Sequence, residues 1–127
     1  MADISKEILD IFTRKIPQIY PNSTIRQHQV QMALDVADFL FNKSERVMFV
    51  EAPVGTGKSL GLLIPSSIYS REQSKNIIYA TSTISLQNQI FDDDSVILSK
   101  IGLLKNHEKI LAQGKRNYLC ESLVDLN

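Results

Sequence analysis

Residues 51–59, which read EAPVGTGKS, constrain the fold of this chain more than any other stretch. The spacing from Ala52 to Ser59 fits the template of a phosphate-binding loop, with alanine in place of the first glycine. In that template the loop joins the end of a strand to the start of a helix, whose positive end points at the phosphates. The stretch therefore predicts a strand before it and a helix after it.

The flanking residues have the patterns that this arrangement requires. Residues 46–52 (RVMFVEA) are short, rich in Val and Phe, and bounded by polar and proline signals, which predicts a buried strand. A helix is expected from Ser59, with a kink or an unpaired carbonyl at Pro65. Residues 75–83 (KNIIYATST) predict a second strand. We therefore expect an α/β fold that contains a partial parallel sheet flanked by helices.

Helical patterns are typical of the regions outside this unit. From Asp3 to Ile16 apolar residues recur every four positions, which predicts an amphipathic helix. Residues 16–24, with two prolines, are expected to break it, and a second helix is expected over residues 25–41. Downstream, residues 84–91 predict a helix, and the acidic run 92–94 predicts a solvated turn.

Length and composition limit the classes of protein to be considered. A chain of 127 residues, 43% apolar and 22% charged, fits one packed domain. A complete doubly wound domain needs more than two strands, so we expect the first part of a larger domain.

The charge balance and the cysteine content limit the partners and the compartment. Fourteen acidic and fourteen basic residues cancel, so any nucleic-acid contact must be local. The N-terminus fits neither a signal peptide nor a membrane span, and a lone cysteine excludes an internal disulfide, which together predict a cytoplasmic protein without a membrane partner.

The residue types of the loop suit the phosphates of a nucleotide. Gly55 and Gly57 leave out the side chains that would keep backbone N–H groups away from an anion. Lys58 would reach the outer phosphates, and the Ser59 hydroxyl would meet a magnesium ion. The candidate ATP-binding residues of the loop are Pro53, Val54, Gly55, Thr56, Gly57, Lys58 and Ser59, of which Lys58 and Ser59 are also the candidate catalytic residues. The alternative is a simple glycine turn whose lysine faces water.

The order of motifs resembles the start of a superfamily 2 helicase of the DinG and XPD type. Residues 20–40 look like that family's adenine-recognition segment, and residues 51–65 resemble its phosphate loop, including the alanine and the later proline. Residues 80–90 (ATSTISLQNQI) look like motif Ia. Residues 114–120 (GKRNYLC) resemble the segment that ends at the first cysteine of a four-cysteine iron-sulfur site.

The resemblance implies a RecA-like P-loop NTPase domain, present here only in its beginning, and a role for each motif. Within this N-terminal portion of motor domain 1 (residues 1–127), residues 1–45 would recognise adenine, 46–91 would form the P-loop and motif Ia unit, and 92–127 would begin the iron-sulfur-type insertion. The residues implied are Arg26 and Gln29 for adenine, Thr81, Ser82 and Thr83 for single-stranded DNA, and Cys120 as first ligand of a [4Fe-4S] cluster in a longer parent. The local excess of positive charge adds Lys115 and Arg116 as candidates for lining a channel for single-stranded DNA.

Each of these residues also has an ordinary structural alternative. Arg26 and Gln29 could be exposed helix residues, residues 81–83 could be strand formers and a helix cap, and the basic residues near 115 could be a solvated face. A lone cysteine such as Cys120 is usually a small buried apolar residue.

The function implied by the resemblance is that of an ATP-dependent DNA helicase, of which this is the N-terminal part. The parent would hydrolyse ATP with magnesium and move on single-stranded DNA from 5′ to 3′. The chain itself lacks the acidic motif II and the second motor domain, so we expect it to be catalytically incomplete without the remainder of the helicase or a completing partner subunit. The alternatives are a short nucleotide- or DNA-binding regulatory module and a small P-loop kinase.

Overall fold

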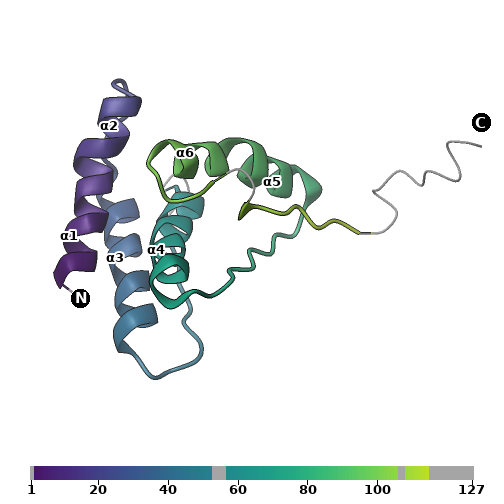
Figure 1. The fold of residues 1–127 in the computed structure, drawn as a ribbon, viewed down its shortest axis with the longest axis horizontal. Coiled ribbons are helices and arrows are strands. Elements are labelled where there is room, and N and C mark those ends of the chain that lie inside the picture. The colour runs from purple at the N-terminus through teal and green to yellow at the C-terminus, as the bar shows by residue number, and fades with distance from the viewer. Residues whose placement is uncertain (1, 53–56, 106–107, 115–127) are drawn as a thin grey trace, which may run out of the picture.

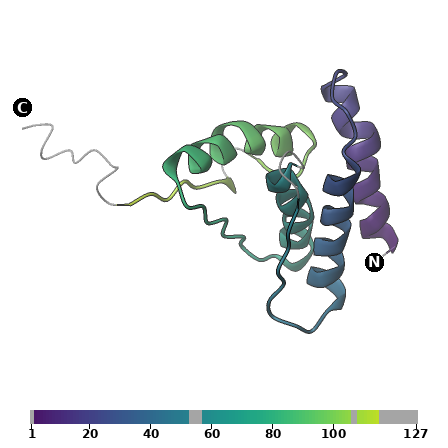
Figure 2. The same ribbon diagram turned by 180° about the vertical axis from the view of Figure 1, so that it is seen from behind.

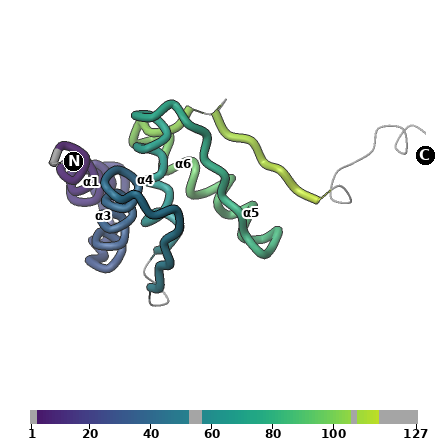
Figure 3. Tube along the Cα trace, turned by 90° about the horizontal axis from the view of Figure 1, so that it is seen from below, coloured from purple at the N-terminus to yellow at the C-terminus, as the bar shows by residue number. Residues whose placement is uncertain are grey.

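The computed structural model describes residues 2–52, 57–105 and 108–114, and the secondary structure of these residues is helical. In chain order the elements are α1 (Ala2–Asp10), the π-helical turn η1 (Ile11–Lys15), α2 (Ile16–Ile19), α3 (Gln27–Asn42), α4 (Lys58–Gln73), α5 (Ile84–Gln89), the π-helical turn η2 (Ile90–Asp94) and α6 (Ser95–Lys100). Figure 1 shows α1, α3 and α4 side by side, with α6 beside one end of α4. Figure 3, seen from below, shows the arm of α5 and α6 extending to one side of the three longer helices.

The α/β fold predicted from the sequence is wrong, because no strand forms among the residues that the structure describes. Residues 46–52 and 75–83 are open chain, and Figure 2 shows the second of them as an extended connection between α4 and α5. A strand must hydrogen-bond to a neighbouring strand, whereas a helix pairs its backbone groups within its own segment. Neither predicted strand has a neighbouring strand here. Several of their apolar side chains face solvent instead, with Phe49 95% and Ile78 92% exposed, although Tyr79 packs against the core.

The helix predictions agree better with the structure. The helix expected over residues 25–41 is α3, Gln27–Asn42. The N-terminal helix extends further than expected, since the chain stays helical through η1 and α2. Pro17 does not break it because Pro17 lies at the first turn of α2, where a backbone N–H is not required. The helix after the phosphate loop continues through Pro65, which is fully buried.

The core lies between the three longer helices and α6. α3 and α4 approach closely at Gly61, where a Cβ atom would lie 3.1 Å from the sulfur of Met32. The buried apolar residues of the core are Ile8, Ile11, Phe12, Ala33, Ala37, Leu63, Ile64, Ile68, Leu98 and Ile101. Within the described ranges, no helix has both the length and the apolar character needed to cross a membrane.

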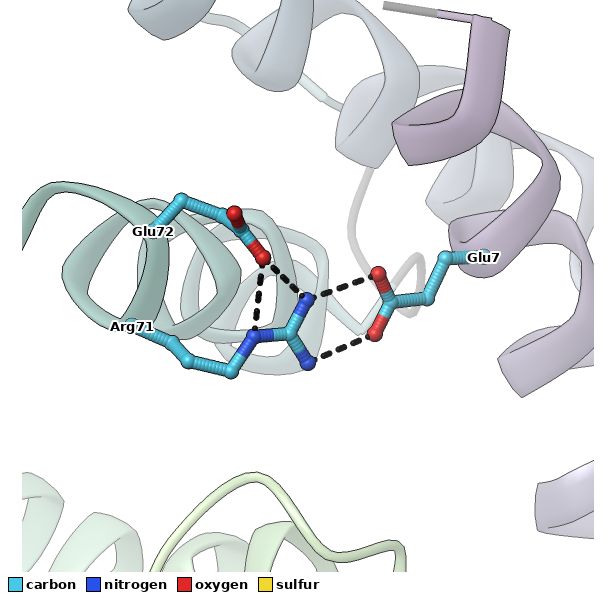
Figure 4. A network of polar contacts seen from close by, with 3 residues as sticks. All are labelled: Glu7, Arg71 and Glu72. Carbon is cyan, nitrogen blue, oxygen red and sulfur yellow. Dashed lines mark hydrogen bonds and ion pairs between the residues drawn. The ribbon is translucent and has the colours of Figure 1, made fainter.

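An ion-pair network ties the C-terminal end of α4 to α1. The Arg71 guanidinium donates to both carboxylate oxygens of Glu7, at 2.8 and 2.9 Å, and also to Glu72 (Figure 4). Hydrogen bonding to Arg71 lowers the pKa of Glu7, although partial burial opposes the shift. The network holds the two helices together at the surface, at the end of α4 opposite to its start at Lys58.

Candidate functional site

The head of α4 is the described part of the predicted phosphate loop. Gly57 has φ of 82° and ψ of 52°, the left-handed conformation that glycine adopts without strain, and Lys58 begins the helix directly after it. Lys58 is exposed and Ser59 is half-buried. The first N–H groups of a helix lack partners within the helix, so they and the positive end of the helix dipole favour an anion there. The remaining loop candidates, Pro53, Val54, Gly55 and Thr56, lie outside the described residues.

Gln29 packs directly against this glycine. Its Nε2 donates a hydrogen bond to the Gly57 carbonyl at 2.9 Å, and the residue is only 8% exposed. A Cβ atom at position 57 would lie 2.2 Å from Gln29 Nε2 and 3.1 Å from Arg26 Nη1. The structure thus brings the two predicted adenine-recognition residues to the start of α4. Gln29 is no ordinary exposed helix residue, whereas Arg26 remains exposed.

A hollow of about 590 Å³ adjoins these residues, a volume typical of small-ligand pockets. It lies between the N-terminal helical segment, the head of α3 and the start of α4. Its lining includes Phe12, Tyr20, Arg26, Gln29, Leu60 and Ile97. The Lys100 ammonium lies 5.1 Å from the centroid of the Tyr20 ring, a cation–π contact that adds a positive charge near this aromatic wall.

Asp94 is the site residue that the sequence interpretation missed. Residues 92–94 belong to η2, so the solvated turn predicted for them is wrong, although Asp92 and Asp93 are exposed. Burial raises the pKa of Asp94, as does the nearby Asp93 carboxylate, while the neighbouring Ser59 hydroxyl opposes the shift. A sequence pattern could have revealed this position. Ile90, Asp94 and the buried Leu98 are spaced four residues apart, which puts Asp94 on the inward face of a helix.

The predicted motif Ia lies at the start of α5. Thr83 caps this helix, because its Oγ1 accepts a hydrogen bond from the Leu86 N–H at 3.2 Å. The Thr81 hydroxyl donates to the Thr83 carbonyl at 3.0 Å. The helix-cap alternative is therefore confirmed for Thr83, and contact of residues 81–83 with DNA stays a prediction.

The predicted basic and iron-sulfur residues, Lys115, Arg116 and Cys120, lie outside the described residues. Lys109, close to them in sequence, is engaged in the fold: its ammonium donates to the Phe91 carbonyl at 3.0 Å and the Ser95 hydroxyl at 2.8 Å. It also lies 4.4 Å from the centroid of the Phe91 ring. Across the described ranges, no group of three or more His, Cys, Asp or Glu residues comes together to hold a metal ion.

Comparison with known proteins relates the chain to DinG-like helicases. Over 106 residues, 84% of the chain, it is 37% identical to the ATP-dependent DNA helicase DinG of Salmonella typhimurium and 36% identical to that of Escherichia coli. Over 111 residues it is 35% identical to a probable ATP-dependent helicase of Methanocaldococcus jannaschii, covering 16% of that protein. The chain spans only 14% of the length of the two DinG proteins. No family model and no solved structure matches it.

Proposed function

We propose that this chain is the N-terminal part of an ATP-dependent DNA helicase and that the head of α4 binds the phosphates of ATP. The observation that carries the proposal is the contact between Gln29 and Gly57, with the amide nitrogen 2.9 Å from the carbonyl oxygen. It puts a polar side chain suited to a nucleobase beside a helix start suited to phosphates. The similarity to ATP-dependent DNA helicases supports the same conclusion independently.

Each residue at this site has a separate role in the proposal. Lys58 is the charge that meets the outer phosphates, and Ser59 is the hydroxyl that meets the magnesium ion carried with them. Gln29 uses one amide hydrogen on Gly57, which leaves its second N–H and its carbonyl oxygen for the edge of adenine. The adjoining hollow, whose lining has apolar side chains beside polar ones, would give the base a place to lie.

DNA contact and ATP hydrolysis belong to the longer protein in this proposal. Residues 81–83 would contact single-stranded DNA through hydroxyl and backbone groups, as is common for phosphate contacts, and Lys115 and Arg116 would add charge. Hydrolysis and 5′ to 3′ movement would require groups from the rest of the helicase or a completing subunit. A [4Fe-4S] cluster needs four thiolates, and Cys120 is the one cysteine of this chain, so a longer parent would have to supply the others.

Titration calorimetry with ATP and magnesium tests the nucleotide site. The unmodified chain should bind with a micromolar Kd, about −8 kcal/mol, and Lys58→Ala should abolish the binding. Lys6→Ala, a matched change of an exposed lysine on α1, should leave it unaltered. Failure of the unmodified chain to bind ATP, or equal loss in both variants, would contradict the proposal.

A further inference from the structure

An extended segment, residues 109–114, runs beside α5 (Figures 1 and 3). Exposure alternates along it. The half-buried residues are Lys109, Leu111 and Gln113, and the exposed ones are Ile110, Ala112 and Gly114. A period of two is that of an extended chain with one face turned inward. Residues 109–114, called the docked segment below, therefore lie on the helices with a defined face.

Lys109 holds the start of the docked segment on η2 and α6. Its ammonium donates to the Phe91 carbonyl at 3.0 Å and to the Ser95 hydroxyl at 2.8 Å, and it lies 4.4 Å from the centroid of the Phe91 ring. An ammonium has three N–H donors, so two of them are used within the chain. A charge that leaves water must be paired or hydrogen-bonded, which these contacts provide.

The other end of the docked segment is bonded to α5 through two side-chain amides. Gln87 Nε2 donates to the Ala112 carbonyl at 3.1 Å, and Gln113 Nε2 donates to Asn88 Oδ1 at 3.2 Å. The two bonds run in opposite directions, one from α5 to the docked segment and one back. The docked segment thus connects α5 to the contacts of Lys109 with η2 and α6.

Apolar packing does little to hold α5 in place. Within the described ranges α5 buries no residue, and its Ile84 and Leu86 side chains are each 44% exposed. Gln87 is the one residue of α5 that is half-buried. Because a helix of six residues is marginal on its own, the position of α5 depends on its neighbours, among which is the docked segment.

The same glutamine connects the docked segment to the residues predicted to contact DNA. The Gln87 backbone N–H donates to the Thr83 carbonyl at 3.1 Å, and the Thr81 hydroxyl donates to the same oxygen at 3.0 Å. Contacts with DNA phosphates use hydroxyl and N–H groups whose positions fix the register of the protein on the strand. A displacement of α5 would therefore displace Thr81 and Thr83 as well.

We propose that Lys109 is a positioning residue for single-stranded DNA, which holds the docked segment on the helices and through it orients residues 81–83. This inference rests on the proposed contact between those residues and DNA. The Lys109 ammonium itself meets no phosphate, because a carbonyl and a hydroxyl already bind it. When the ammonium is removed, the docked segment detaches for part of the time, and only the docked fraction binds DNA with full affinity.

Fluorescence anisotropy of a labelled oligothymidylate, measured over a series of salt concentrations, tests this role. Lys109→Met should weaken DNA binding by about 10-fold, as expected when about one molecule in ten remains docked. The slope of log affinity against log salt should not change, whereas loss of a direct phosphate contact reduces it by about one. Lys109→Arg, which keeps the charge and the donors, should restore the affinity. Lys6→Met, at an exposed lysine of α1, controls for the loss of charge.

Two further measurements separate positioning from a general loss of the fold. Calorimetric titration should give Lys109→Met the same affinity for ATP as the unmodified chain, because the nucleotide site lies on α3 and α4 whereas Lys109 is bonded to η2 and α6. In a Gln87→Ala background, Lys109→Met should cause little additional loss of DNA affinity, since both residues act on the docked segment.

Several results would overturn the inference. They are unchanged DNA affinity in Lys109→Met, no recovery in Lys109→Arg, a salt slope reduced by about one, a parallel loss of ATP affinity, and full additivity with Gln87→Ala. If the unmodified chain binds no single-stranded DNA, the proposed DNA contact itself fails, and this inference fails with it.

Hydrogen exchange on the unmodified chain covers the case in which Lys109→Met does not fold. A ligand that binds only the docked form stabilises that form, so DNA should slow the exchange of N–H groups in the docked segment as well as in α5. Slower exchange in α5 alone would show that the docked segment has no part in DNA binding, and the inference would be wrong.

Discussion

The bundle of α1, α3 and α4 and the two open segments, residues 46–52 and 75–83, treat apolar side chains in opposite ways. In the bundle Ile64 and Ile68 are fully buried, whereas Phe49 and Ile78 on the open segments are 95% and 92% exposed. Both regions have apolar runs, so composition does not explain the difference. Helices pair their backbone groups first and can then pack, while an extended segment must find a partner for both its backbone and its side chains.

The largest effect should come from a cavity in the bundle. Ile64→Ala should lower the free energy of unfolding by about 2–5 kcal/mol, because a fully buried side chain of α4 loses its packing. The control, Ile78→Ala on an open segment, should change it by less than about 0.5 kcal/mol. Urea denaturation followed by circular dichroism measures both. If the two variants lost similar amounts of unfolding free energy, Ile78 would be packed in solution, and the difference between bundle and open segment would not hold.

An intermediate effect is expected where open chain meets helix, at Gly57. Gly57→Ala should cost about 1–3 kcal/mol, since alanine is strained in the left-handed conformation and its Cβ would displace the Gln29 amide. Gly102→Ala is the matched control, because Gly102 has a φ of 85° and nothing within 4 Å of its Cβ position. The excess cost at position 57 should vanish in a Gln29→Ala background. Equal costs for the two glycine variants in the unmodified background would show that Gln29 does not hold this junction.

The smallest effect should come from the surface of the bundle, at the Glu7–Arg71 pair. Because its folded-state pKa is lowered from the ordinary 4.5, ionised Glu7 stabilises the fold above that value, and the contribution is lost as the pH falls through the lowered pKa. Arg71→Gln should therefore cost less than about 1 kcal/mol near neutral pH, and nothing in acid. Urea midpoints measured across this pH range test the prediction, with Lys6→Gln as control. A difference that does not vary with pH would refute it.

The elements that the sequence predicted well are those whose evidence is local. The limits of α3 and the helix start after Gly57 follow from apolar spacing, glycine and helix geometry over a few residues. The two predicted strands had equally clear local patterns, but strand formation depends on a partner segment, which local patterns do not contain. Pro17 shows a smaller error of the same kind, since its effect depended on its position within a helical turn.

By itself the sequence predicted the candidate phosphate loop and the helix that begins at its end. Tertiary structure alone decided that Gln29 bonds to Gly57. The physical reason is range: a helix pairs its backbone between residues four apart, so its sequence carries the needed information. Contacts between side chains far apart in the chain depend instead on how α3, α4 and η2 pack, which no single segment specifies.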